Sequence, residues 1–411
     1  MPGAGGATLG AFGPTDVLAA ARALEGAGRR VLHLEVGEPD VPTPAHVVEA
    51  GVRALRDGHT RYSPPAGIPE LRAAAAASLA ARGVPADPGR VVVGPGAKAV
   101  LFAALLAAVR AGDEVLVPDP GYAAYREIAE RAGGRAVAYA LDAGRGFAVD
   151  VDAVRARVTR GTRVLVVNAP HNPTGGVLGR AVREELAELA CRHDLLVVSD
   201  EIYARHVYTE AAPADVPAAH PSLAGLPGMA ERTVVVDGCS KAYAMTGWRL
   251  GYGAVPARFV GPVTAVLAQA ATCTATFVQH AGVAALAGPQ DALVAQVAEL
   301  RRRRDVLVAA LGAIDGVACP APGGALYAFP RVAEALAGTG WGVEAFARRL
   351  LEEYGVACVP GTAFGPGGAG HVRLALTAPV EELTAAAGAF GACLRAIAAG
   401  VPASSPVRAN C

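Results

Sequence analysis

Three short motifs contain residues that could do chemistry on a small bound molecule. Lys241 lies in the segment GCSKAYAMTGWRLG, Asp200 follows the apolar run LLVVS, and a glycine-rich turn at 94–98 follows VVV. A lysine amine can attack a carbonyl group to form a Schiff base, and a carboxylate stabilises a neighbouring cation. A glycine-rich turn before a helix binds phosphate through backbone N–H groups. Pyridoxal 5′-phosphate (PLP) needs all three from the protein that holds it.

The elements around these motifs should place them at one edge of a sheet. Asp200 and the lysine segment each follow a short run rich in β-branched residues, and amphipathic stretches such as 178–192 separate the runs. This alternation predicts parallel strands covered by helices on both faces, an α/β fold whose ligands bind at the carboxyl ends of the strands. The predicted strands begin near residues 91, 114, 135, 163, 194 and 233.

The chain after Gly251 has a different pattern. A long helical region is predicted over 258–313, followed by short strands in GGALYAF and HVRLAL and a final helix over 379–398. This order is typical of a smaller α+β domain. The predicted division is an N-terminal arm and part of the small domain at 1–45, a large domain at 46–285, a small domain at 286–400 and a flexible tail at 401–411.

From Val17 to Ile397 the chain resembles the class I/II aminotransferases of PLP fold type I, particularly the branch that contains bacterial aspartate aminotransferases. The lysine segment matches almost throughout, and the segments NAPHNPTG, DEIY and DPGYAAY match as well. The resemblance implies PLP as cofactor. It also implies a large domain with a mostly parallel, seven-stranded sheet sandwiched by helices.

The lysine segment would then hold the cofactor. The resemblance implies that Lys241 forms the Schiff base and afterwards moves a proton between the substrate's α-carbon and the cofactor. Ser240 and Arg249 would bind the phosphate, the arginine through its planar fork. Gly238 stands where many relatives have serine. One hydrogen bond to the phosphate would therefore be absent.

The segments DEIY and NAPHNPTG would bind the cofactor's ring. By resemblance, Asp200 pairs with the pyridine nitrogen, while Asn172 and Tyr203 donate to the phenolic oxygen. Asn172 would also contact the substrate. Together with the lysine, Asp200 and Tyr203 form the predicted catalytic set. His171 is expected to support this turn rather than act as a base, and Glu201 to have a structural role.

The glycine-rich turn and the segment DPGYAAY complete the predicted cofactor site. Gly96, Ala97 and Lys98 would lie at the phosphate, and Tyr122 would stack on the ring. In some aspartate-type relatives the lysine of this turn contacts a distal acidic group, so Lys98 points to acidic substrates. The resemblance also implies that the segment 270–277 of the neighbouring subunit helps to set the side-chain specificity, and this segment contains no arginine to pair with a distal carboxylate. Neutral and aromatic amino acids therefore remain open.

Further motifs imply a shared site and a substrate carboxylate. Tyr62, in the segment RYSPPAG, would reach the phosphate of the neighbouring subunit, which implies a homodimer with shared active sites. Gly37 and Arg373 come from opposite ends of the chain, and by resemblance both converge on the substrate. Arg373 would pair with the α-carboxylate in a bidentate manner.

The expected reaction is ping-pong transfer of an amino group between an L-amino acid and a 2-oxo acid. The same scaffold also supports PLP-dependent lyases, γ-replacement enzymes, cyclising enzymes and arginine-oxidising enzymes, so these alternatives stay open. A non-catalytic regulatory relative is disfavoured because Lys241 is present and no additional DNA-binding segment occurs.

Composition limits the partners and the compartment. Lys plus Arg number 37 and Asp plus Glu number 37, which removes the electrostatic argument for nucleic acid or an anionic membrane as main partner. The apolar stretch 101–109 is far shorter than the ~20 residues of a membrane span, and the N-terminus lacks a signal-peptide pattern. Seven cysteines without CxxC spacing indicate neither a disulfide framework nor a metal site. We expect a cytoplasmic protein.

Overall fold

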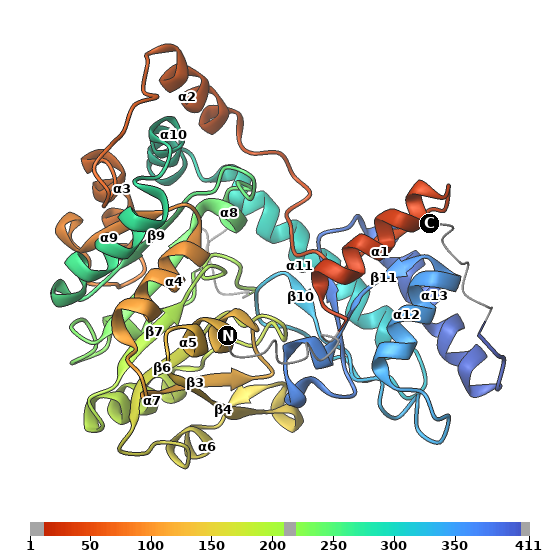
Figure 1. The fold of residues 1–411 in the computed structure, drawn as a ribbon. Coiled ribbons are helices and arrows are strands. Elements are labelled where there is room, and N and C mark those ends of the chain that lie inside the picture. The colour runs from red at the N-terminus through yellow and green to blue at the C-terminus, as the bar shows by residue number, and fades with distance from the viewer. Residues whose placement is uncertain (1–11, 209–218, 404–411) are drawn as a thin grey trace, which may run out of the picture. The chain divides into compact units, whose positions relative to one another are not determined.

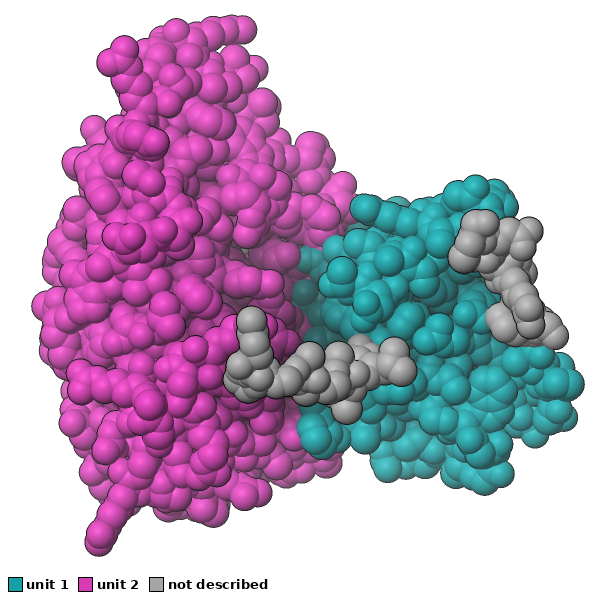
Figure 2. Space-filling view, in the orientation of Figure 1, with its two compact units in different colours: residues 1–37, 302–321, 327–411 teal, residues 38–301, 322–326 magenta. Residues whose placement is uncertain are grey.

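The computed structural model describes residues 12–208 and 219–403. The chain forms two compact units, which Figure 2 colours separately. Unit 1 comprises residues 1–37, 302–321 and 327–411, and unit 2 comprises residues 38–301 and 322–326. Most of the tail expected at 401–411 lies outside the described residues. The domain boundaries predicted from the sequence stay a prediction.

Unit 2 contains a mixed sheet that has eight strands within the described residues (Figure 1). In order across the sheet these are β2 (Val91–Gly94), β9 (Gly251–Ala254), β8 (Thr233–Gly238), β7 (Leu196–Asp200), β6 (Thr162–Asn168), β3 (Glu114–Asp119), β4 (Arg135–Asp142) and β5 (Ala148–Val149). The central strands from β8 to β4 run parallel. The pairs β2–β9, β9–β8 and β4–β5 are antiparallel.

The α/β fold class is confirmed, and every predicted strand of the sheet occurs. The sheet has one strand more than the predicted seven, because the two-residue β5 adds to one edge through Leu141 and Asp142. Such a short strand leaves no periodic pattern. The sequence pattern also missed β9, whose sequence GYGA combines two glycines with only one residue that favours strands.

Alternate residues of the strands pack into two separate cores. In β8, Val234 and Val236 join one core, whereas Val235 joins the other, as the two-residue period of a strand requires. The first core includes residues of α4 (Ala97–Ala108), α5 (Ala124–Arg131) and α9 (Ala257–Ala271). The second includes residues of α3 (Pro69–Ala80) and α10 (Thr276–Ala287). Helices therefore cover both faces, which leaves the strand ends for ligands.

The region predicted as one long helical stretch at 258–313 consists of three helices. The first, α9, ends before Thr272, which has a φ of 59°. The second, α10, ends at Gly288-Pro289, where proline cannot continue a helix. The third is α11 (Asp291–Gly312), whose residues from Arg302 onward belong to unit 1. The other helices described in unit 2 are α2 (Ala45–Arg56), α6 (Val151–Arg155), α7 (Arg180–Arg192) and α8 (Cys239–Ala242).

The described residues of unit 1 form two small sheets and three further helices. The strand β1 (Leu32–His33) pairs in parallel with β11 (Val356–Ala357). The second sheet has the order β10 (Tyr327–Ala328), β13 (Val372–Ala375), β12 (Val359–Pro360), and both of its pairs are antiparallel. The helices are α1 (Pro14–Gly26), α12 (Val343–Tyr354) and α13 (Val380–Ala398).

Short 3-10 helices connect several of these elements. They are η1 (Pro88–Arg90), η2 (Ala143–Arg145), η3 (Leu223–Gly225), η4 (Gly361–Phe364) and η5 (Pro366–Gly368). Within the described ranges, no helix has both the length and the apolar character needed to cross a membrane.

Candidate active site

The carboxyl ends of β6 and β7 bring the predicted ring-binding residues together. Asn168 and Asp200 are direct partners in the register of these two strands. The side-chain amide of Asn168 donates to the carbonyl oxygen of Asp200 over 2.9 Å, and its side-chain oxygen accepts from the backbone N–H of Asn172 over 2.8 Å. Asn168 therefore holds the turn that carries Asn172 against the strand end that carries Asp200.

Asp200 is a buried carboxyl with a perturbed proton affinity. Its Oδ2 accepts from the hydroxyl of Tyr125 over 2.7 Å, and its Oδ1 accepts from the backbone N–H of Ile202 over 3.2 Å. Burial raises the pKa of Asp200 to about 6, and the nearby Glu201 and Asp237 add to this, although both hydrogen bonds act to lower it. A cation placed beside Asp200 would stabilise its ionised form.

Lys241 lies on α8, which begins directly after β8. The side chain is half-buried, and the carbonyl oxygen of Lys241 accepts from the amide of Gln296 over 3.4 Å. At Gly238, an added Cβ would lie 3.0 Å from the carbonyl oxygen of Leu250 and 3.1 Å from the Cα of Gly251. This crowding gives a physical reason for glycine at the position where many relatives have serine.

The glycine-rich turn lies directly against the arginine of the lysine segment. Gly96 is the N-cap of α4 and has a φ of 95°. A Cβ on Gly96 would come within 2.3 Å of Nη2 of Arg249. The guanidinium donates to the carbonyl oxygens of Thr246 over 2.7 Å and Pro95 over 3.5 Å.

The backbone of the same turn is equally close to β9. A Cβ on Gly251 would come within 2.1 Å of the backbone nitrogen of Ala97. The first N–H groups of a helix have no partner within the helix. The structure thus places the N-terminus of α4 beside a cation, an arrangement that binds anions such as phosphate.

Further aromatic side chains lie near Tyr125, the hydrogen-bond partner of Asp200. Tyr122 and Tyr125 meet edge to face, with ring centroids 5.5 Å apart, and Nζ of Lys98 lies 5.4 Å from the centroid of the Tyr122 ring. Tyr203 is buried, and its ring lies 6.2 Å from that of His206 in an edge contact. Lys98 and Tyr122, predicted to lie in one site, are therefore neighbours.

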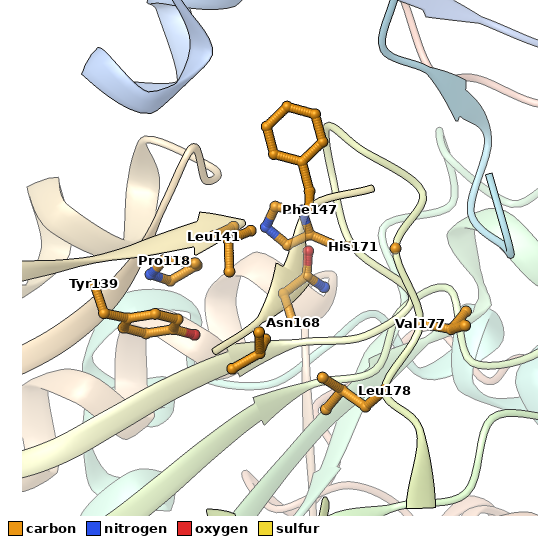
Figure 3. Close-up of a pocket in the computed structure, with 10 residues that line it drawn as sticks. Pro118, Tyr139, Leu141, Phe147, Asn168, His171, Val177 and Leu178 are labelled. Carbon is orange, nitrogen blue, oxygen red and sulfur yellow. The ribbon is translucent and has the colours of Figure 1, made fainter. Parts of the chain in front are cut away.

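His171 supports its turn, as expected, and its environment keeps it neutral. Its Nδ1 lies 2.9 Å from the hydroxyl of Thr174, and burial lowers its pKa to about 3. Figure 3 shows the ring in a small pocket that Asn168 and Phe147 also line. A buried imidazole that stays neutral down to acid pH is poorly suited to accept a proton from a substrate near neutrality.

In unit 1, the predicted substrate residues Arg373 and Gly37 lie around one tyrosine. The guanidinium carbon of Arg373 lies 4.3 Å from the ring centroid of Tyr327 and 4.8 Å from that of Phe364, and Nη2 donates to the carbonyl oxygen of Glu35 over 2.5 Å. A Cβ on Gly37 would come within 2.0 Å of the Tyr327 hydroxyl oxygen. Gly37 and Arg373, which come from opposite ends of the chain, thus both lie next to Tyr327.

Comparison with known proteins identifies the family. Residues 29–390 match the family model for aminotransferase class I and II. The chain belongs to this family.

This aminotransferase is similar to curated and solved relatives over most of its length. It is 40% identical to a bifunctional aspartate aminotransferase and glutamate/aspartate-prephenate aminotransferase of Petunia hybrida, over 89% of this chain and 77% of that protein. The structure of the aspartate aminotransferase of Thermus thermophilus with maleate matches this chain with a TM-score of 0.85 and 38% sequence identity. The match covers 92% of this chain and 96% of the Thermus chain. An aromatic aminotransferase of Pyrococcus horikoshii has a TM-score of 0.84 and 37% identity, over 91% and 98% of the two chains.

One predicted cofactor residue of the aminotransferase does not pack on its own chain. Tyr62 is 85% exposed. Its loop is nevertheless fixed, because the buried side chain of Gln279 donates to the Ser63 hydroxyl over 2.9 Å and to the Thr274 carbonyl over 2.7 Å, and accepts from the N–H of Ile68 over 2.8 Å. The two segments predicted to serve a neighbouring subunit, around Tyr62 and at 270–277, are thus joined on one surface.

Sequence reasoning missed residues that contact the predicted site residues. Tyr125 and Tyr327 were within recognised segments, but their partners Asp200 and Arg373 are far away along the chain. Arg82, which binds Glu201, lies in a helical region with no motif. An arginine that follows an alanine-rich helical segment is common on protein surfaces, so the sequence does not mark Arg82 as buried.

Proposed function

We propose that this aminotransferase uses PLP held by Lys241 and transfers amino groups between an L-amino acid and a 2-oxo acid by a ping-pong mechanism. The observation that carries the proposal is the buried carboxyl of Asp200, whose pKa is raised to about 6 mainly by burial. Such a carboxyl favours a cationic partner, and a pyridine nitrogen that carries a proton is such a partner.

The surrounding residues fit the rest of the cofactor. Gly96 and Gly251 leave no room for side chains between the N-terminus of α4 and Arg249, so backbone N–H groups and a guanidinium can reach a phosphate together. We assign phosphate binding to Gly96, Ala97, Ser240 and Arg249. When bound, PLP joins the lysine through its aldehyde carbon and withdraws electrons from a substrate's Cα, which makes the Cα proton acidic.

The side chains of the protein then have distinct tasks. The amine of Lys241, free once the substrate's amino group has taken its place on the cofactor, would take the proton from the substrate's Cα and deliver it to the cofactor's aldehyde carbon. Asp200 stabilises the protonated ring nitrogen, while Asn172 and Tyr203 donate to the phenolic oxygen. The guanidinium of Arg373 binds the substrate's α-carboxylate through two parallel hydrogen bonds.

For the substrate, we propose an acidic amino acid. Lys98 places a cation 5.4 Å from the ring of Tyr122, the side chain that we assign to stacking on the cofactor. A carboxylate at the far end of the substrate would be attracted to this cation. The similarity to proteins named aspartate aminotransferases supports the same choice.

The experiment is a single half-reaction. The purified, PLP-loaded protein is mixed with one amino acid at a time, without an oxo acid, and absorbance and products are recorded. We expect one equivalent of 2-oxo acid per site, fastest with aspartate or glutamate, and no reaction with Lys241→Ala. Continuous release of ammonia or of a side-chain leaving group would instead establish a lyase or a replacement enzyme. Turnover by Lys241→Ala would refute the role of Lys241.

A further inference from the structure

A buried group of charged side chains lies next to Asp200 in unit 2. Arg82, just beyond the end of α3, donates from Nη1 to Oε2 of Glu201 over 2.8 Å and from Nη2 to Oδ2 of Asp237 over 2.9 Å. The three side chains are only 2%, 3% and 7% exposed. One guanidinium therefore joins two carboxylates that come from different strands.

Both carboxylates belong to the strand ends that carry the proposed catalytic residues. Glu201 directly follows Asp200, and its N–H donates to the carbonyl oxygen of Val236 in β8 over 2.8 Å. Asp237 lies in β8, shortly before Lys241, and accepts from the N–H of Gly238 over 2.7 Å. A displacement of either carboxylate would shift the backbone beside a catalytic residue.

Other polar groups complete the hydrogen bonding of the two carboxylates. The hydroxyls of Ser199 and Ser222 donate to Oε1 of Glu201 over 2.8 and 2.5 Å. The hydroxyl of Tyr252 lies 3.4 Å from Oδ2 of Asp237. A buried polar network in which the members find partners is rigid and specifies one arrangement.

Charge in this network is balanced. Burial raises the pKa of Asp237, and Arg82 acts to lower it. A second arginine, Arg205, donates to the Ser78 hydroxyl over 2.6 Å and also acts to lower the pKa of Asp237. Burial opposes the charge on Arg82, but Glu201 and Asp237 outweigh burial, so its pKa is raised and it stays charged. Two cations therefore face two anions, close to a third buried carboxyl.

We propose that Arg82 is a positioning residue for the amino-transfer site, because it joins Glu201 to Asp237 and so fixes the strand ends of β7 and β8. By neutralising these anions it also keeps Asp200 ionised opposite a bound cation. The inference depends on the proposed function, since it assumes that PLP binds at Lys241 with its ring nitrogen at Asp200.

The test uses the absorbance of the PLP-loaded protein as a function of pH. The midpoint of this titration reports how strongly the lysine-bound cofactor holds its proton. Arg82→Met leaves an excess of negative charge and should move the midpoint to higher pH. Glu201→Gln leaves an excess of positive charge, because arginine cannot lose its proton, and should move it to lower pH. A full charge roughly 10 Å away shifts a pKa by about one unit at an effective dielectric constant of about 20.

Two further variants distinguish the effect of the Arg82 charge on the titration from the effect of its hydrogen bonds on stability. In the double variant Arg82→Met/Glu201→Gln the charge is balanced again, and the midpoint should return to its native value. Arg82→Lys keeps the charge but loses the planar fork, so it should melt at a lower temperature than the native protein and titrate with the native midpoint. Should Arg82→Met fail to fold, Glu201→Gln and Arg82→Lys still carry the test.

Several charged and titratable groups lie near Asp200, Asp237 and Lys241. Asp200 is influenced by Tyr125 from α5, by the adjacent Glu201 and by Asp237 from β8. Asp237 is influenced by Arg82, Arg205 and Glu201. His206 lies close enough to Lys241 for the charge of the lysine to lower the pKa of His206. Only the mutated groups differ between the variants, so a change of midpoint reports on them.

The matched control is Arg90→Met. Arg90 binds Glu231 over 2.8 Å and the carbonyl oxygen of Ala230 over 2.5 Å, and both partners precede β8, whereas Lys241 follows the opposite end of this strand. Its loss should lower the melting temperature without moving the titration midpoint. If Arg82→Met behaves like this control and Glu201→Gln also titrates at the native midpoint, Arg82 has only a structural role. If the native protein shows no cofactor titration at all, the proposed function itself fails.

Discussion

The hydroxyl of Tyr125 donates to Oδ2 of Asp200 over 2.7 Å, and both side chains are buried. This hydrogen bond acts to lower the pKa of Asp200, against the larger effect of burial. The proton affinity of Asp200, which we assign as partner of the ring nitrogen, is therefore adjusted by a side chain of helix α5.

We predict that Tyr125→Phe raises the pKa of Asp200. A hydrogen bond to a charged group contributes about 2 kcal/mol, so kcat should fall by roughly tenfold or more near neutral pH. The acid limb of the kcat profile should move to higher pH, because Asp200 then takes up a proton more readily. The measurement is kcat against pH for the native and variant proteins. A variant with lower kcat but an unmoved acid limb would contradict this role.

The second prediction concerns the cofactor-free protein. Because burial raises the pKa of Asp200 from 3.8 to about 6, the folded state binds a proton more tightly than the unfolded state. The stability that this proton contributes is fully present below pH ~4 and is lost as the pH rises through about 6, an effect of a few kcal/mol. Denaturant unfolding of the cofactor-free protein at several pH values measures it.

The comparison variant for this prediction is Asp200→Asn. Asparagine does not titrate, so the difference in unfolding free energy between the two proteins isolates Asp200 from other buried carboxyls such as Asp237. The difference should change between pH 4 and 7. A constant difference over this range would show that Asp200 is ionised throughout.

The motifs and the strands that carry them were accessible from the sequence because each depends on neighbours along the chain. Asp200 and Lys241 directly follow apolar runs, and parallel strands bring such ends to one edge. The contacts of Tyr125 and Arg82 were not accessible, because their partners come from distant strands and no pattern marks them. The strand β9 was not predicted for a different reason, since its position is set by close packing of Gly251 on Ala97 rather than by β-propensity.

The third prediction tests the close approach of Gly37 to Tyr327. A Cβ on Gly37 would lie 2.0 Å from the tyrosine oxygen, so Gly37→Ala must displace the ring that Arg373 contacts. We expect KM for the amino acid to rise by at least about tenfold, as misplacing a substrate-binding group does. Gly26→Ala, where an added Cβ meets no atom within 4 Å, is the control and should have the native KM. An unchanged KM in Gly37→Ala would show that this contact does not matter for binding.

The fourth prediction concerns Arg373 itself. Its guanidinium contacts the rings of both Tyr327 and Phe364, which favours a planar cation over a compact ammonium. Arg373→Lys should therefore lower kcat/KM by roughly a hundredfold, corresponding to about 3 kcal/mol of lost bidentate binding. Steady-state kinetics with amino acid and oxo acid measure this. Arg331→Lys, an exposed arginine paired with Glu334, serves as the control and should have little effect.

The last prediction tests whether two subunits share each site. If Tyr62 serves the neighbouring subunit, Lys241→Ala and Tyr62→Ala homodimers are both impaired, but a mixed dimer contains one site with both native residues. Random mixing of equal amounts, through unfolding and refolding together, should thus restore about a quarter of the native activity, because half of the dimers are mixed and each has one intact site. The activity of the mixture is compared with that of each variant refolded alone. Activity that stays at the mean of the two variants would place Tyr62 outside the partner's site, even if the protein proves dimeric.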